Sequence, residues 1–230
     1  MQQNDPSKKS GHDLGGATAE PAKVNPMQSP AMRILMGVVG VIVMISGIMQ
    51  MMSGFKEMNS GGMPSEKDRA AVVEKSLAAM TEFQDPSSAF TMSYPSNWKR
   101  TPKVEAPTIL HLAVYEGTVN VIATAEDEPK DLTAVEYAKV TDEAISKAIP
   151  KDSLKRISEE DISLNGTPAR KWTQVVSSVS GGEKVNVKQV MILTTKNGKG
   201  YCVTASALEN WYSQFEPVFD KMASSIKIKD

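Results

Sequence analysis

The feature of this sequence that most constrains its structure is a long uncharged run near the N-terminus. From Ile34 to Phe55 the chain has no Asp, Glu, Lys or Arg, and Arg33 and Lys56 bracket the run. A helix that crosses a bilayer needs about 20 predominantly apolar residues. The run is too long for the apolar part of a secretory signal peptide, and no small-residue cleavage site follows it. It therefore predicts a single transmembrane helix, which we assign to residues 31–55.

The alternative for this run is a buried helix of a soluble domain, but core helices of this length without a polar face are unusual. In the membrane interpretation, large aliphatic and aromatic side chains contact the lipid. These anchor residues are Ile34, Leu35, Val38, Val41, Ile45, Ile48 and Phe55.

Flanking charge bears on the orientation of the anchor, because Lys and Arg are enriched on the cytoplasmic side of membrane spans. Lys23 and Arg33 precede the run, whereas Lys56, Lys67, Arg69 and Lys75 follow it. This distribution mildly favours a cytoplasmic C-terminal domain. A cytoplasm-facing adaptor therefore stays open as an alternative.

Composition divides the rest of the chain and excludes some functions. A length of 230 residues suits one domain plus an anchor, and residues 1–30, rich in Gly, Pro, Ser, Asn and Gln, are expected to be a disordered tail. A net charge of -1 gives no electrostatic footprint for nucleic acid, so no nucleic-acid partner is expected. The single Cys202 excludes an intrachain disulfide framework.

Residues 56–85 are predicted to form a linker and a spacer helix. Ser65 is a candidate N-cap, Glu66 follows it in the first turn, and apolar positions continue to Phe83. The helix could equally be the first element of the domain that follows.

Residues 86–230 are typical of an antiparallel sheet with one helix inserted midway and another at the end. Hairpin turns are predicted at Glu116-Gly117, Asn165-Gly166, Gly181-Gly182 and Asn197-Gly198. Thr133 and Glu136 have the spacing of a capping box, and Pro150 ends the helix that they begin. A final helix is expected from about Gln214, with Pro217 in its first turn. This order predicts an α+β layered domain with about seven strands, the first at Ala89–Tyr94.

Three local sequences resemble the PsbP-like family, which includes PsbP and DcrB-like proteins. They are FTMSYPSNW at 90–98, ISLNGTPA at 162–169 and EPVFDKMASSI at 216–226. With the order of elements, the resemblance covers about residues 86–228. It implies an α-β-α sandwich without enzymatic activity that binds a partner protein at the outer face of a membrane. No metal or contact residue of the family matches this chain position by position.

The chemistry-bearing residues do not form a catalytic pattern. His12 lies in the predicted tail, and His111 falls within a predicted strand, where a structural role is the simpler interpretation. Cys202 also falls within a strand and is interpreted as a buried, inert thiol. No G-x-S-x-G or comparable nucleophile turn is present. We expect no catalytic residue and no cofactor.

Two weak metal candidates remain. Glu126, Asp127 and Glu128 could bind a hard cation, although acidic residues before a helix are also favoured by its dipole. Met49, Met51 and Met52 could bind Cu(I), although methionine also suits a membrane-embedded helix. We assign no metal, and a Met-dependent copper-handling protein remains an alternative.

Together these patterns predict a single-pass membrane protein whose C-terminal domain lies on the periplasmic side. Its expected partners are the lipid bilayer and a protein in or at the membrane.

Overall fold

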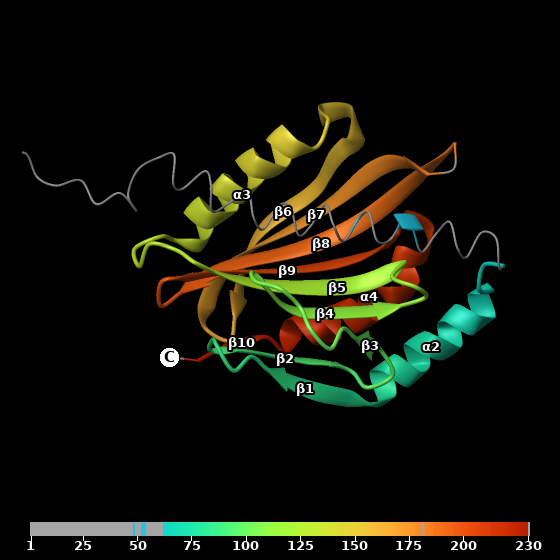
Figure 1. Cartoon of the computed structure of the whole chain (residues 1–230), viewed down its shortest axis with the longest axis horizontal. Coiled ribbons are helices and arrows are strands. Elements are labelled where there is room, and N and C mark those ends of the chain that lie inside the picture. Colours follow the sequence, from blue (N-terminus) through green and yellow to red (C-terminus); the bar gives the residue numbers. More distant parts are fainter. Residues whose placement is uncertain (1–47, 49–51, 54–61, 181, 230) are drawn as a thin grey trace, which may run out of the picture.

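The computed structural model describes residues 48, 52–53, 62–180 and 182–229 of the chain (Figure 1). The predicted tail at 1–30 lies outside these residues, and so does the predicted anchor except for Ile48, Met52 and Ser53. Among the described residues, no helix is both long enough and apolar enough to cross a membrane.

The chain forms two antiparallel sheets. The larger has the strand order β3-β4-β5-β9-β8-β7-β6, and the smaller has the order β1-β2-β10. The large sheet consists of β3 (Lys99–Arg100), β4 (Thr108–Val114), β5 (Val119–Asp127), β6 (Leu154–Leu164), β7 (Thr167–Ser180), β8 (Glu183–Lys196) and β9 (Lys199–Leu208). The small sheet consists of β1 (Met80–Gln84), β2 (Phe90–Pro95) and β10 (Lys227–Ile228). The predicted α+β fold with a seven-stranded antiparallel sheet is confirmed.

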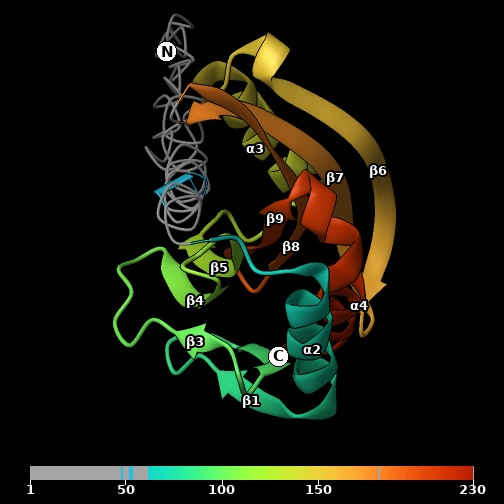
Figure 2. The same ribbon diagram turned by 90° about the vertical axis from the view of Figure 1, so that its right-hand side faces the viewer.

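Helices cover both faces of the large sheet. They are α2 (Glu66–Ala78), α3 (Ala134–Ala148) and α4 (Glu209–Ser224), with a short 3-10 helix, η2 (Lys151–Ser153), before β6. Helix α3 packs on β7 and β8 from one side, while α4 packs on β8 and β9 from the other (Figures 1 and 2). Helix α2 and strand β2 pack against α4. We call the two sides of the large sheet the α3 face and the α4 face.

Local sequence explains most of the turns and caps. Asn165 and Gly166 have φ values of 50° and 92°, and Asn197 and Gly198 have values of 55° and 73°. These positive values are what a tight two-residue hairpin requires. At the start of α3, the Glu136 backbone N–H donates to the Thr133 hydroxyl at 3.2 Å, which confirms the capping box.

Helix α2 is shorter than predicted. Ser65 caps its start, but the helix ends at Ala78. The expectation that it continues to Phe83 is wrong, because Met80–Gln84 forms β1 and pairs with β2 through backbone hydrogen bonds. The apolar positions at Met80 and Phe83 thus belong to a strand.

Helix α4 is longer than predicted, because it begins at Glu209 rather than near Gln214. Its additional first turn buries Trp211 and Tyr212, which extend the apolar stripe of the helix. Pro217 therefore lies inside the helix and not in its first turn, which corrects the prediction.

The strand predicted at Ala89–Tyr94 lies outside the large sheet. It forms β2, between β1 and β10 in the small sheet. The seventh strand of the large sheet is the two-residue β3, which extends the edge beyond β4. The count of seven is therefore right, although one strand was assigned to the wrong sheet.

Candidate functional site on the α3 face

A row of polar side chains crosses the α3 face. Each residue of the row is paired with the next one on the neighbouring strand. The order is Asn120 of β5, Ser206 of β9, Gln189 of β8, Gln174 of β7 and Arg156 of β6. Directly paired residues point to the same face of a sheet. We call these five residues the polar row. Asn120, Ser206, Gln189 and Gln174 are all buried, which is unusual for such a concentration of amides.

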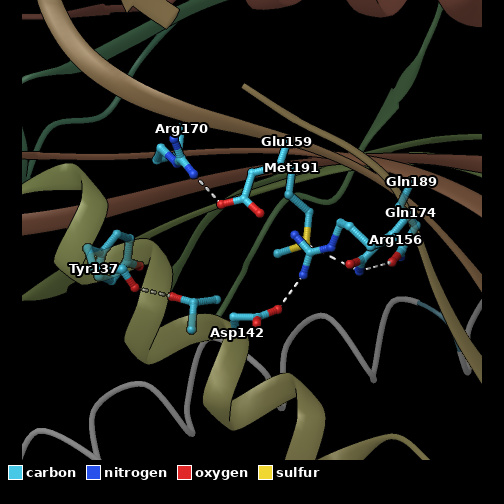
Figure 3. Close-up of polar contacts among 9 residues, drawn as sticks. Tyr137, Asp142, Arg156, Glu159, Arg170, Gln174, Gln189 and Met191 are labelled. Atoms are coloured by element: carbon cyan, nitrogen blue, oxygen red, sulfur yellow. Dashed lines mark hydrogen bonds and ion pairs between the residues drawn. The ribbon is translucent and has the colours of Figure 1, made fainter. Parts of the chain in front are cut away.

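Side-chain hydrogen bonds join residues of the polar row, and Figure 3 shows the one between Gln174 and Gln189. The Gln189 amide nitrogen donates to the Ser206 hydroxyl at 3.1 Å, and the Gln174 amide nitrogen donates to Gln189 Oε1 at 3.2 Å. At the β5 end, the Asn120 amide nitrogen donates to the Gly117 carbonyl at 3.0 Å. A buried amide without partners costs about 1–3 kcal/mol, so these bonds make the row tolerable inside the fold.

Arg156 enters the polar row through a β-bulge. The pairs next to the Asn165-Gly166 turn would, if continued, place Ile157 opposite Gln174, but the register shifts between Arg156 and Ser158. The shift sets Arg156 opposite Gln174 and leaves Ile157 half exposed. Bulges often redirect a side chain in this way.

The guanidinium of Arg156 joins the sheet to α3. It forms an ion pair with Asp142 of α3 (Figure 3). It also lies 4.0 Å from the ring centroid of Trp172. Burial lowers the pKa of Arg156, whereas Asp142 and Glu159 raise it. A guanidinium stays charged at neutral pH, so this is a cation held between a carboxylate and an aromatic face.

Two donors at this end lack acceptors. Among the described residues, neither Nη1 of Arg156 nor Nε1 of Trp172 has a hydrogen-bond partner, although both atoms are buried. Buried donors without partners are rare in native proteins. An oxygen acceptor from a water or a bound chain would satisfy them, which makes this end of the row a candidate contact point.

An open cavity of about 490 Å³ lies next to the polar row. The end of α3 and the β7–β8 hairpin line it, with Ile149, Val176 and Lys184 among the lining residues. Ile48 also lines it, and Val179 at its rim is 70% exposed. An apolar cavity beside a polar row suits an amphipathic partner.

The acidic candidate ligands Glu126, Asp127 and Glu128 are not brought together around one point. The Tyr137 hydroxyl donates to Glu126 at 2.6 Å, and Lys199 forms an ion pair with Asp127 at 2.8 Å. Burial raises the pKa of Glu126, while the bond from Tyr137 lowers it. The described part of the chain contains no group of three or more His, Cys, Asp or Glu residues placed to hold a metal ion.

The predicted anchor and copper candidates are only partly described. Ile48 is buried and Met52 is partly buried, both against the domain. The other candidates lie outside the described residues; they are Met49, Met51, Ile34, Leu35, Val38, Val41, Ile45 and Phe55.

His111 and Cys202 both lie on the α3 face but are not joined into a catalytic pair. Nδ1 of His111 lies 3.0 Å from the Thr101 hydroxyl, and burial lowers the pKa of the imidazole. Burial raises the pKa of the Cys202 thiol to about 12. At neutral pH this thiol is protonated and is therefore a poor nucleophile.

The architecture is an α+β sandwich in which helices cover both faces of one antiparallel sheet. The chain belongs to the PsbP family, whose model, described as PsbP, matches residues 78–228. The implied family is thereby confirmed. A search of curated proteins finds none that matches the chain significantly.

Several solved structures are similar to this chain at low sequence identity. The solution structure of cyanobacterial PsbP (CyanoP) from Synechocystis sp. PCC 6803 is 17% identical, with a TM-score of 0.51, and the match covers 66% of this chain and 94% of that one. The Ran-binding protein Mog1p of Saccharomyces cerevisiae is 11% identical, with a TM-score of 0.48, covering 66% and 96%. LpqN of Mycobacterium tuberculosis, involved in cell envelope biogenesis, is 14% identical, with a TM-score of 0.47, covering 74% and 99%.

Proposed function

We propose that this protein is a non-enzymatic accessory protein that is tethered to a membrane by residues 31–55 and binds a protein partner there. The observation that carries the proposal is the combination of a PsbP family domain at 78–228 with the uncharged run at 34–55 just before it. Such a run is long enough to span a bilayer. A domain attached to it works within a short distance of the membrane surface.

The chemistry of the described residues favours binding over catalysis. The Cys202 thiol is buried and protonated, and His111 is bonded to a threonine hydroxyl rather than to a nucleophile or carboxylate. General acid–base and nucleophilic catalysis both need such pairs within hydrogen-bond reach. We therefore assign no catalytic residue.

The proposed contact surface is the end of the domain formed by the β7–β8 hairpin. Val179 is exposed there beside the apolar cavity, and Lys184 lines both that cavity and a second one that includes Met63. Met63 lies closer in sequence to the proposed anchor than α2 does. This end is therefore well placed to meet a partner in or on the membrane.

Crosslinking in intact membranes tests the binding proposal. The full chain should crosslink to a discrete partner, and Val179→Glu should reduce the yield because it places a charge beside the apolar cavity. Ile157→Glu is a matched control, since Ile157 is also an exposed aliphatic residue but lies on β6. Equal yields from both variants would show that the hairpin end is not the contact surface.

Membrane attachment and orientation need separate measurements. The full chain should resist alkaline carbonate extraction, whereas a variant lacking residues 1–56 should be released. We place the C-terminal domain on the periplasmic side. A C-terminal alkaline phosphatase fusion should then be active, and activity only of a green fluorescent protein fusion would indicate the cytoplasm-facing adaptor instead.

A further inference from the structure

The α3 face is wider than the helix that gives it its name. Helix α3 packs on β7 and β8, whereas the face continues across β9 and β5. Thr204 and Ser206 of β9 and Asn120 of β5 are nevertheless buried. These side chains are therefore shielded from water, although they lie on strands where α3 makes few contacts.

Two residues of the uncharged run pack against the domain on this side of the sheet. Ile48 is 8% exposed and belongs to the same apolar cluster as Trp172, Met191 and Cys202. Met52 is partly buried and packs against the apolar clusters of both faces. The Ser180 hydroxyl donates to the Met52 carbonyl at 3.4 Å, which joins this segment to the end of β7.

The spacing of these two contacts is that of residues on one side of a helix. Ile48 and Met52 are both helical, and residues four apart project from the same side of a helix. The polar row on this face does not oppose an apolar cover, because Gln174, Gln189 and Ser206 hydrogen-bond to one another.

We propose that the α3 face is a docking surface for the chain's own segment 34–55, which therefore has two alternative hosts, the sheet and the bilayer. Exposure of so many apolar side chains to water is unfavourable, so the segment occupies one host or the other. Ile48 lines the cavity at the β7–β8 hairpin end, and the docked segment therefore blocks part of the proposed contact surface. The bilayer as second host rests on the proposed function, whereas the docking contact does not.

Disulfide crosslinking in the full chain tests the docking contact. Ile48→Cys is combined with Val176→Cys in a Cys202→Ser background, because Ile48 and Val176 line the same cavity. The matched control replaces Val176→Cys by Val175→Cys, since adjacent strand residues point to opposite faces. In lipid-free buffer, the first pair should form about tenfold more intrachain disulfide than the control, because disulfide geometry is demanding.

Equal yields from the two pairs would overturn the proposal, and so would a disulfide that forms only between chains, which would show docking onto a second copy. Circular dichroism and thermal unfolding check that each variant folds. Ile48→Cys with Ile149→Cys provides a second pair if Val176→Cys fails to fold, because Ile149 lines the same cavity.

Flotation with phosphatidylcholine vesicles, combined with the disulfide assay, then tests the docking proposal and the proposed function separately. The chain is added to the vesicles with its cysteines reduced and is oxidised only afterwards. The expected result is that it floats with the vesicles and forms no disulfide between positions 48 and 176. A chain that floats but shows no such disulfide in lipid-free buffer overturns docking and leaves membrane attachment standing. A chain that forms the disulfide but never floats overturns membrane attachment. A disulfide that still forms when floated chains are oxidised overturns the exchange between hosts.

Discussion

The two faces of the seven-stranded sheet are built from different chemistry. On the α4 face, aromatic rings meet edge to face, as Phe215 does with Trp98 at 6.4 Å and with Tyr115 at 6.3 Å. On the α3 face, the polar row contains hydrogen-bonded side chains, and the guanidinium of Arg156 at its end lies over Trp172. The first arrangement maximises buried apolar area, while the second keeps polar groups inside at a cost that their mutual bonds offset.

Strand β5 shows the contrast within one segment. Val119, Val121 and Ala123 point to the α4 face, while Asn120, Ile122 and Thr124 alternate to the α3 face. All six are buried. Both faces of β5 are equally buried, so burial alone does not show how much each face contributes to folding stability. We therefore expect the α4 face to contribute more to folding stability than the α3 face, which is suited to a cover that can change.

The largest expected effect comes from removing a ring on the α4 face. Phe215→Ala should lower the free energy of unfolding by about 3–5 kcal/mol, because Phe215 is fully buried and its loss leaves a cavity. Chemical denaturation of the domain measures the change. Val135→Ala on the exposed side of α3 is the control and should stay within about 0.5 kcal/mol. A loss below about 1 kcal/mol for Phe215→Ala would contradict the division between the faces.

A smaller loss is expected within the polar row. Gln189→Leu should destabilise the chain by about 1–3 kcal/mol, because it removes hydrogen bonds to Gln174 and Ser206 while their polar groups stay buried. The double variant Gln174→Leu with Gln189→Leu should cost less than the sum of the single changes, since both amides leave together.

The control for the polar row is Gln84→Leu, which makes the same change at an exposed position of β1 and should be nearly neutral. Additive losses in the double variant would show that the row is not a coupled network. The two faces would then differ only in composition.

Local signals in the sequence predicted much of the fold. The Asn165-Gly166 and Asn197-Gly198 turns and the Thr133 capping box depend on residues close together in the chain, and the structure confirms all three. The predicted end of α2 and the predicted start of α4 are wrong, because both depend on contacts between residues far apart in the chain. Met80 and Phe83 fit a helical pattern locally, but pairing with β2, a non-local interaction, makes them a strand.

The candidate site was not predictable in the same way. The polar row takes residues from five strands, so it exists only once the register of each pair is known. Gln174 and Gln189 have no local signature in the sequence. The bulge that sets Arg156 rather than Ile157 opposite Gln174 is also absent from the hydrophobic pattern, which would favour burying the isoleucine.

The ion pair between Arg156 and Asp142 sharpens the comparison at the rim of the α3 face. Asp142→Asn should cost only about 0.2–1 kcal/mol, because both side chains are partly exposed and water screens the pair. The cost should shrink in 1 M salt, where the screening length is about 3 Å. The control is Asp161→Asn, which removes a second ion pair near the rim, the one between Asp161 and Arg170. If Asp142→Asn lowered the free energy of unfolding by more than about 2 kcal/mol, the pair would behave as a buried ion pair and not as one at the rim.

The smallest effect concerns His111, which lies on the α3 face and whose pKa is lowered by burial. The unfolded chain therefore binds the imidazole proton more tightly than the folded chain does. Full stability is present above the unfolded value of about 6.5 and is lost as pH falls from there through the lowered pKa of the folded state. Glu126 acts in the opposite direction, because its pKa is raised. The free energy of unfolding of the unchanged chain must therefore be compared with that of a His111 variant at each pH.

Replacement of the imidazole isolates its contribution to the pH dependence. His111→Gln keeps a polar side chain but removes the proton-binding group, so its free energy of unfolding should fall less than that of the unchanged chain between pH 7 and pH 5. Urea denaturation across that range measures the difference, and His12→Gln controls for the other histidine of the chain. Parallel curves for the unchanged chain and His111→Gln would mean that the folded protein holds His111 with no lowered pKa. The α3 face at β4 would then be open to water rather than covered.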